Sequence, residues 1–314
     1  MVDFTIHPNL IRATFVVALI LLLAAGIYAY LFFNRPGAHA DNVGQRVRYM
    51  GLFLMIFILS MITSTRLLII YVAFLSFLGL KEFLSITPTR RADRRVLFWI
   101  YLAIPVQYFF IAMDWYPAFI AFVPAYLFVF IPFCMVVISD TDGFLQAIAT
   151  LSWGTVTMIY CMGHLAYLLL LHPPYVSEVG GMGLFLFLVV LAQMSHVIQY
   201  AFGKIIDNPK LQLKITTTRN WASLIGSVCV TMLLAFLAAP YLTPLNWWQA
   251  LIIGAAVAIA SFIGYLTMTG IKTDLRLKDR GTMTPGHGGV MNRIDTVIYS
   301  APVFFHVISY LMTA

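Results

Sequence analysis

The stretch WASLIGSVCVTMLLAFLAAPYL occupies residues 221–242, and WQALIIGAAVAIASFIGYLTMTGI follows at residues 248–271 after five intervening residues. Neither stretch contains a charged residue. The hydrocarbon core of a bilayer is roughly 30 Å thick, and a helix crosses it with about 20 apolar residues. The pair therefore predicts two membrane-spanning helices joined by a short turn.

Similar apolar stretches continue along almost the whole chain. Of the 314 residues, 61% are hydrophobic and 10% are charged, a balance that would leave large apolar patches on a water-soluble domain. Further spans are expected at residues 10–33, 50–62, 66–83, 96–113, 117–138, 144–171, 181–203 and 294–313. We therefore expect an all-α, polytopic transmembrane bundle of about ten helices, with its active site in cytoplasmic loops and helix ends.

Two of these stretches depart from the simple pattern. Residues 10–33 are too long for the core of a signal peptide, and Arg35-Pro36-Gly37 follows in place of a cleavage site, so we expect a retained helix. Arg66 interrupts the apolar residues 50–83, which are too many for one span and few for two. A tight hairpin and a re-entrant element both fit that segment.

Lys and Arg concentrate in four linkers, at residues 35–48, 81–95, 204–219 and 272–293. Positively charged loops stay in the cytoplasm, and the expected spans give an even number of crossings between each pair of these linkers. The connections around Asp114 and at residues 172–180 contain neither Lys nor Arg and are expected in the periplasm, as are both termini. The pattern predicts a multi-pass protein of a bacterial inner (cytoplasmic) membrane.

The charge distribution argues against a nucleic-acid-binding protein, and the cysteine positions argue against a paired-cysteine site. The net charge of +7 lies in short loops and not on one amphipathic face, which favours membrane topology and an anionic lipid or nucleotide over nucleic acid. Cys134, Cys161 and Cys229 lie inside apolar stretches without a CxxC pair, so we expect them to pack as small hydrophobic residues.

The most highly charged segment is TGIKTDLRLKDRGTMTPGHGGVMNRIDT, at residues 269–296. Its bases alternate with carboxylates, whereas membrane topology alone would need only the bases. The glycines between Gly281 and Gly289 leave backbone N–H groups able to hold phosphate oxygens. Arg293 and Asp295 then open the last apolar helix, beside that glycine-rich run.

These residue types together favour nucleotidyl transfer. Carboxylates hold a divalent metal ion, Lys and Arg neutralise a triphosphate, and a backbone cradle positions the triphosphate for in-line attack. The segment therefore indicates a nucleotidyltransferase before any family is considered.

The same segment resembles the motif of the phosphatidate cytidylyltransferases, also called CDP-diglyceride synthetases. The matching residues are Lys272, Lys278, Asp279, Gly281, Pro285, His287, Gly288, Gly289, Val290, Arg293, Ile294 and Asp295. Four positions depart from the motif: Thr269, Thr273, Thr284 and Asn292, the last standing where the family has an aspartate.

A second, shorter resemblance covers residues 196–226. The matching residues are Tyr200, Gly203, Lys204, Lys214, Ile215, Arg219, Trp221 and Gly226. His196 and Ala222 stand where the family has Asp and Glu, and Glu82 resembles an acidic residue near the end of an early helix. The replaced acids leave open a divergent branch with altered metal use or another phospholipid acceptor.

The resemblance implies that the phosphate of phosphatidic acid attacks CTP, which gives CDP-diacylglycerol and pyrophosphate. It implies catalytic roles for Asp279, Asp295 and Lys278, with both aspartates holding Mg²⁺ and a second metal ion left open. The expected substrate-binding residues are Lys272, His287, Gly288, Gly289, Arg293, Lys214 and Arg219.

The expected partners are CTP, phosphatidic acid and membrane lipids, with no nucleic acid, and the oligomeric state is left open, a homodimer included. We expect one integral membrane domain with N-terminal helices at residues 1–95, central helices at 96–203 and a catalytic region at 204–314. The alternatives are CTP-dependent transfer to another lipid phosphate, a non-catalytic paralogue, and a transporter. A transporter would show charges at the membrane midplane or paired broken helices, whereas these charges lie in loops.

Overall fold

The computed structural model describes residues 55–61, 63–90, 93–137, 142–206, 212–213, 216–275 and 289–313, together with the isolated positions 8, 12 and 15. Apart from those isolated positions, the expected span at residues 10–33 and the basic linker at residues 35–48 lie outside the described residues.

Eight helical segments within the described residues are long and apolar enough to cross a membrane. Six are single α-helices: α3 (Thr65–Ile86), α4 (Arg94–Ala112), α9 (Gly181–Ile205), α10 (Trp221–Leu242), α11 (Trp247–Asp274) and α12 (Met291–Thr313). The other two join shorter pieces: α5 (Tyr116–Ala121), η1 (Phe122–Leu127) and α6 (Phe128–Val137) in one, and α7 (Phe144–Thr155), η2 (Val156–Cys161), α8 (Met162–Tyr167) and η3 (Leu168–Leu170) in the other. The expectation of an all-α, polytopic transmembrane bundle is confirmed.

Two π-helical turns, η1 and η2, interrupt the composite spans and contact each other. Pro124 lies within η1 and has no backbone N–H to donate, which disturbs the regular ladder at this position. Hydropathy cannot reveal such turns, since they leave the apolar character of the span unchanged.

Ser64 divides the apolar residues 50–83. Its hydroxyl accepts the N–H of Leu67 at 3.2 Å and caps the start of α3, while residues 55–61 form a separate helical stretch before it. Arg66 therefore lies in the first turn of α3 and does not interrupt a helix.

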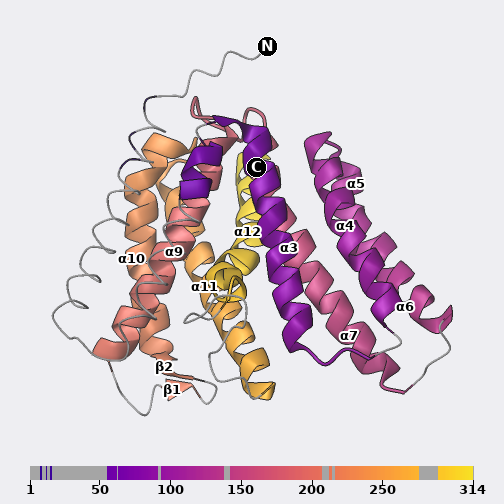
Figure 1. Ribbon diagram of the computed structural model, residues 1–314. Helices are drawn as coiled ribbons and strands as arrows, with labels where there is room; N and C mark the ends of the chain where they lie inside the picture. The colour runs from indigo at the N-terminus through magenta and orange to yellow at the C-terminus, as the bar shows by residue number, and fades with distance from the viewer. Residues whose placement is uncertain are drawn as a thin grey trace.

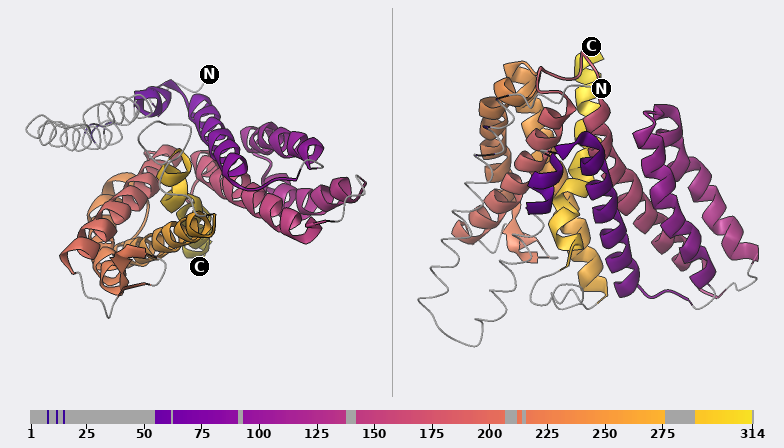
Figure 2. Two further views of the ribbon diagram at one scale, coloured as in Figure 1. Left: turned by 60° about the horizontal axis from the view of Figure 1, so that its bottom comes forward. Right: turned by 45° about the horizontal axis from the view of Figure 1, so that its top comes forward.

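Helix α12 lies at the centre of the bundle. It packs against α9 and α11 on one side and against α3 and α8 on the other, and Figure 2 shows it between these two groups of helices. Helix α10 contacts α9 and α11, whereas α4 and α6 lie on the outer side of the second group (Figure 1). Residues near the N-terminus of α12 are thus placed where several helices meet.

The described parts of three basic linkers lie at one end of the bundle, which we call the motif end. The carboxylate of Glu82, near the end of α3, accepts the N–H of Met291 at the start of α12 at 3.1 Å. A small antiparallel ribbon lies at the same end, formed by β1 (Gln212–Leu213) and β2 (Thr216–Asn220) (Figure 1). We call the opposite end, which carries the connections 113–115, 171–180 and 243–246, the far end.

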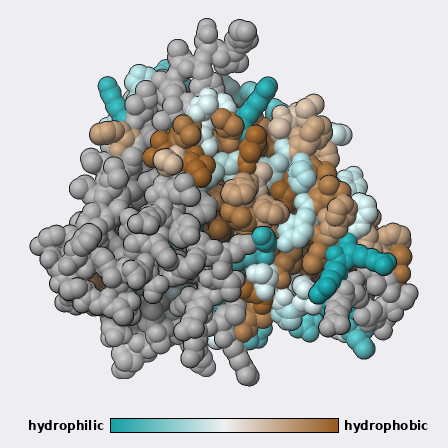
Figure 3. All heavy atoms as spheres, in the orientation of Figure 1, coloured by the Kyte–Doolittle hydropathy of each residue, from teal (hydrophilic) through white to brown (hydrophobic). Residues whose placement is uncertain are grey.

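Grouping these linkers at one end agrees with the even numbers of crossings expected from the sequence. That the motif end faces the cytoplasm stays a prediction. On the face that Figure 3 shows, the hydrophobic residues gather across the middle of the described part, and hydrophilic side chains lie mainly toward its margins. Large exposed side chains such as Phe98, Tyr126 and Phe133 suit a surface that contacts lipid.

Candidate active site

Four charged side chains from separate elements meet at the motif end. Glu82 comes from α3, Arg219 from β2, Lys272 from α11 and Asp295 from α12. Lys272 interacts electrostatically with both carboxylates, and Arg219 interacts with Asp295. We call these four residues the charged cluster.

Glu82 holds the start of α12. Its carboxylate accepts the N–H of Met291 at 3.1 Å, and the N–H groups of Val290 and Gly289 also donate to it. A negative charge is favourable at a helix N-terminus, where the first N–H groups have no partner within the helix. Glu82 is only 3% exposed, so it fixes this junction as a buried structural charge.

Gly289 allows this close approach. A Cβ atom at position 289 would overlap Cδ, Oε1 and Oε2 of Glu82, so any other residue here would force the Glu82 carboxylate to move. We expected the Gly289 amide to bind phosphate, but in this structure it donates to Glu82. A phosphate contact at this amide would require Glu82 to release it.

Asp295 lies one turn into α12 and is 3% exposed. One of its oxygens, Oδ1, accepts the N–H of Thr296 at 2.6 Å. Lys272 and Arg219 both interact with this carboxylate and offset the cost of burying its charge. Gly264 of α11 lies so close to the Asp295 backbone that a Cβ atom at position 264 would overlap the Asp295 carbonyl oxygen.

Arg219 is the most constrained member of the cluster, and it is 2% exposed. Its Nη1 donates to Oε1 of Gln199, and its Nη2 lies 3.1 Å from Nδ1 of His196. Its Cζ lies 3.4 Å from the centroid of the Tyr265 ring. Since a guanidinium can only donate, Nδ1 of His196 is the acceptor and the ring carries its proton on Nε2.

Burial lowers the pKa of Arg219 to about 10, and the interactions with Tyr265 and Asp295 limit the fall. The guanidinium is therefore still charged at neutral pH. Gln199 is itself held in place, because its Nε2 donates to Oγ of Ser195 at 2.9 Å and to the carbonyl of Ala258 at 3.3 Å.

The charged cluster pairs two carboxylates with two bases. Three backbone N–H groups stabilise Glu82, and Lys272 interacts with Glu82 as well as with Asp295. The bases Lys272 and Arg219 are the members of the cluster that can donate hydrogen bonds to phosphate oxygens.

Arg293 leaves α12 two residues before Asp295 and thus from another face of the helix. It interacts electrostatically with Tyr71 of α3, and its carbonyl accepts Nε2 of Gln193 at 3.2 Å. Lys204, which belongs to the second resemblance, lies on the last turn of α9. Its ammonium lies 4.6 Å from the Tyr200 ring centroid.

Several predicted site residues lie outside the described residues: Lys214, Lys278, Asp279, His287 and Gly288. Among the side chains that the structure does describe, no group of three or more His, Cys, Asp or Glu could hold a metal ion. Asp295 has the oxygen donors that Mg²⁺ prefers, but it would supply one ligand of such a site and not the whole set.

Gln199 and Tyr265 are the members of this site that sequence reasoning missed. A glutamine inside an apolar span is costly in lipid, and that signal could have marked Gln199 as a polar contact. Tyr265 carries no such signal, because tyrosine is common in membrane helices. The structure places His196, which stands where the family has an aspartate, against Arg219.

Known proteins resemble this chain over different lengths. The uncharacterized protein YnbB of Escherichia coli K12 is 32% identical over 291 residues, which cover 93% of this chain and 95% of that protein. The phosphatidate cytidylyltransferase of Brucella abortus (strain 9-941) is 26% identical over 129 residues, and that of Mycobacterium leprae is 28% identical over 131 residues. These two alignments cover 41–42% of this chain and 48% and 42% of the two enzymes.

The Cytidylyltransferase family model matches residues 44–311, which include seven of the eight described spans in full, all but the end of the last one, and all four members of the charged cluster. The match agrees with the motif at residues 269–296 and with the grouping of Lys272 and Asp295 that the bundle produces. This chain belongs to the cytidylyltransferase family.

Proposed function

We propose that this protein transfers the cytidylyl group of CTP to phosphatidic acid, with CDP-diacylglycerol and pyrophosphate as products. The observation that carries the proposal is the charged cluster, in which Lys272 and Arg219 converge on buried Asp295 at the end of the bundle where the motif begins. Family membership supports cytidylyl transfer. The named relatives in Brucella and Mycobacterium supply the lipid substrate by analogy alone.

The proposed reaction is one in-line displacement. An oxygen of the lipid phosphate forms a bond to the α-phosphorus of CTP, and the bond from that phosphorus to the bridging oxygen of the β-phosphate breaks, releasing pyrophosphate. A phosphate monoester is already a good nucleophile, so the protein's task is to position both substrates and neutralise their charge.

Each residue has a proposed part in that task. Lys272 and Arg219 hold phosphate oxygens. Further contacts to the phosphates come from motif residues, which are Lys278, His287, Gly288 and Arg293. Asp295 and Asp279 would hold Mg²⁺, which when bound neutralises charge on the phosphates. Gln199 and Tyr265 keep the Arg219 guanidinium in a fixed orientation.

The test uses purified protein in nanodiscs that contain phosphatidic acid, with labelled CTP and Mg²⁺, and measures labelled CDP-lipid. We expect Asp295→Asn and Asp279→Asn each to lower the turnover number by about 100-fold or more. Asp142→Asn is the matched control, because this exposed acid lies at the same end of the bundle and outside the cluster. Its activity should equal that of the unaltered protein.

Three results would contradict the proposal in different ways. CTP binding without product from any lipid phosphate would identify a non-catalytic protein. Product from another lipid phosphate, but none from phosphatidic acid, would replace the acceptor and keep the reaction. Full activity in Asp295→Asn would remove that aspartate from the site.

A further inference from the structure

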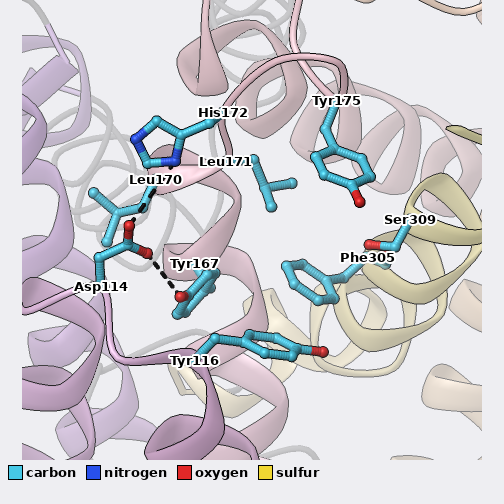
Figure 4. A pocket seen from close by; sticks show the side chains of 9 residues that line it. All are labelled: Asp114, Tyr116, Tyr167, Leu170, Leu171, His172, Tyr175, Phe305 and Ser309. Atoms are coloured by element: carbon cyan, nitrogen blue, oxygen red, sulfur yellow. Dashed lines mark hydrogen bonds and ion pairs between the residues drawn. The ribbon is translucent and has the colours of Figure 1, made fainter. Parts of the chain in front are cut away.

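A cavity of about 310 Å³ opens at the far end of the bundle, on the side opposite to the charged cluster (Figure 4). Asp114 comes from the connection between α4 and α5, Tyr116 from the start of α5, and Tyr167 from the end of α8. The connection 171–180 adds His172 and Tyr175, and α12 adds Phe305. The cavity belongs to neither the motif nor the proposed reaction.

Asp114 is held in a conformation that presents its carboxylate to the cavity. Its φ angle is 53°, the left-handed region, which is uncommon for a residue other than glycine and requires support from its surroundings. Its Oδ1 accepts the hydroxyl of Tyr167 at 2.7 Å, whereas its Oδ2 lies 3.9 Å from Nδ1 of His172, beyond hydrogen-bond distance. One carboxylate oxygen is thus held by a hydrogen bond, and the other has the exposed imidazole of His172 as its neighbour, which pairs with it only when protonated.

Aromatic rings form the floor of the cavity below this carboxylate. The ring centroids of Tyr116 and Tyr167 are 5.5 Å apart, those of Tyr167 and Phe305 are 5.8 Å apart, and those of Tyr116 and Phe305 are 6.1 Å apart. Tyr175 lies across the cavity from Asp114 (Figure 4). Aromatic faces beside a carboxylate are the surroundings that bind an alkylammonium group, through cation–π attraction together with charge pairing.

The charge at the far end also selects a cation. The connections 113–115, 171–180 and 243–246 contain two acidic residues, Asp114 and Glu178, and neither Lys nor Arg. A phosphate or carboxylate ligand would therefore meet repulsion from these acids and find no Lys or Arg partner in these connections, where His172 is the one side chain able to carry a positive charge.

The position of the cavity points to the headgroup layer of the membrane. Helix α4 ends at Ala112 and α5 begins at Tyr116, so Asp114 lies just outside two membrane spans. Trp115 beside it is 56% exposed, as is common for tryptophan at the membrane–water interface. We propose that this cavity is a binding site for a small alkylammonium group, of the kind carried by choline and ethanolamine.

Two sources could supply that group, a soluble amine or the headgroup of a membrane lipid. The test uses the full chain in phosphatidylglycerol nanodiscs and measures saturation-transfer NMR signals of added choline, with protein-free discs as the blank. Adding phosphatidylethanolamine or phosphatidylcholine to the discs should reduce the choline signal if lipid headgroups occupy the cavity. An unchanged choline signal would assign the site to soluble amines.

The charge requirement is tested without altering the protein. The alcohol 3,3-dimethylbutan-1-ol has the shape of choline but no charge, and we expect choline to bind about tenfold more tightly or better. Equal binding of the two probes, or no saturable binding of choline, would overturn the proposal.

Two matched variants then locate the site. Asp114→Asn should weaken choline binding by about tenfold, since it removes the charge that pairs with the ammonium group. Glu178→Gln removes the same charge from an exposed position at the same end and should leave binding unchanged. Equal losses in both variants would show general attraction to an acidic surface and would overturn the site. CDP-lipid formation at the motif end is a separate readout, so its loss or presence leaves this result unaffected.

Discussion

A single methyl group at position 289 should disrupt the junction between α3 and α12. The Cβ of Gly289→Ala would occupy the space of the Glu82 carboxyl group, whose Cδ and both oxygens lie within overlap distance. The carboxylate would have to move, and it would then lose N–H donors from residues 289–291.

The size of the effect follows from those contacts. A hydrogen bond to a charged group contributes about 1.5–3 kcal/mol, and overpacking a buried site costs about 1–3 kcal/mol. Glu82 is 3% exposed, so water cannot readily replace the lost donors. We expect Gly289→Ala to lower the free energy of unfolding by ~3 kcal/mol.

The assay is unfolding in mixed micelles with increasing SDS, followed by circular dichroism. Gly270→Ala is the matched control, because a Cβ at that position of α11 has no neighbour within 4 Å. It should leave stability unchanged or raise it by up to about 1 kcal/mol, as alanine is the better helix former.

A double-mutant cycle with Glu82→Ala isolates the cause. Once the carboxylate is absent, adding Gly289→Ala should cost less than about 1 kcal/mol, because nothing remains to overlap. An equal cost of Gly289→Ala in both backgrounds would refute this reasoning and show that the glycine is needed for another reason.

Two further substitutions test the remainder of the site. Arg219→Lys should lower CDP-lipid formation by about tenfold or more and destabilise the protein by about 2 kcal/mol, because a lysine cannot stack on the ring and bond both acceptors. Arg95→Lys, at an exposed position of α4, should change neither quantity, and equal behaviour of the two variants would contradict a fixed guanidinium. Gly264→Ala places a methyl group against the Asp295 carbonyl and should shift the Asp295 side chain, so it should reduce turnover more than CTP binding. Unaltered steady-state kinetics would show that the reaction tolerates this shift of Asp295.

Most of the membrane architecture could be predicted from the sequence. Lipid imposes the length and apolar character of each span, so the expected stretches from residue 66 onward coincide with the eight spans to within a few residues. The segment around Arg66 was ambiguous, because hydropathy averages over the position where Ser64 caps a new helix. The π-helical turns η1 and η2 could not be foreseen either, because they leave the hydropathy of their spans unchanged.

The candidate site was predictable in its charges but not in its contacts. Lys272 and Asp295 stand out as charged residues at the ends of apolar spans, and the bundle brings them together. The sequence can mark Gln199 as a polar residue in an apolar span, but it does not show that Gln199 and Tyr265 hold Arg219, since that contact joins α9, β2 and α11 only once they have packed. Glu82 was noted from a short resemblance, and its role at the start of α12 depends on the tertiary fold.

The length of α11 sets the height at which chemistry can occur. Its 28 residues extend ~42 Å at about 1.5 Å per residue, which exceeds the roughly 30 Å of hydrocarbon that it crosses. The helix is therefore longer than the hydrocarbon is thick, and Lys272 belongs to its last turn. In the proposed reaction, a lipid that meets Lys272 at this end of the helix would keep both tails dissolved in the bilayer. Only the water-soluble nucleotide would have to travel to meet it.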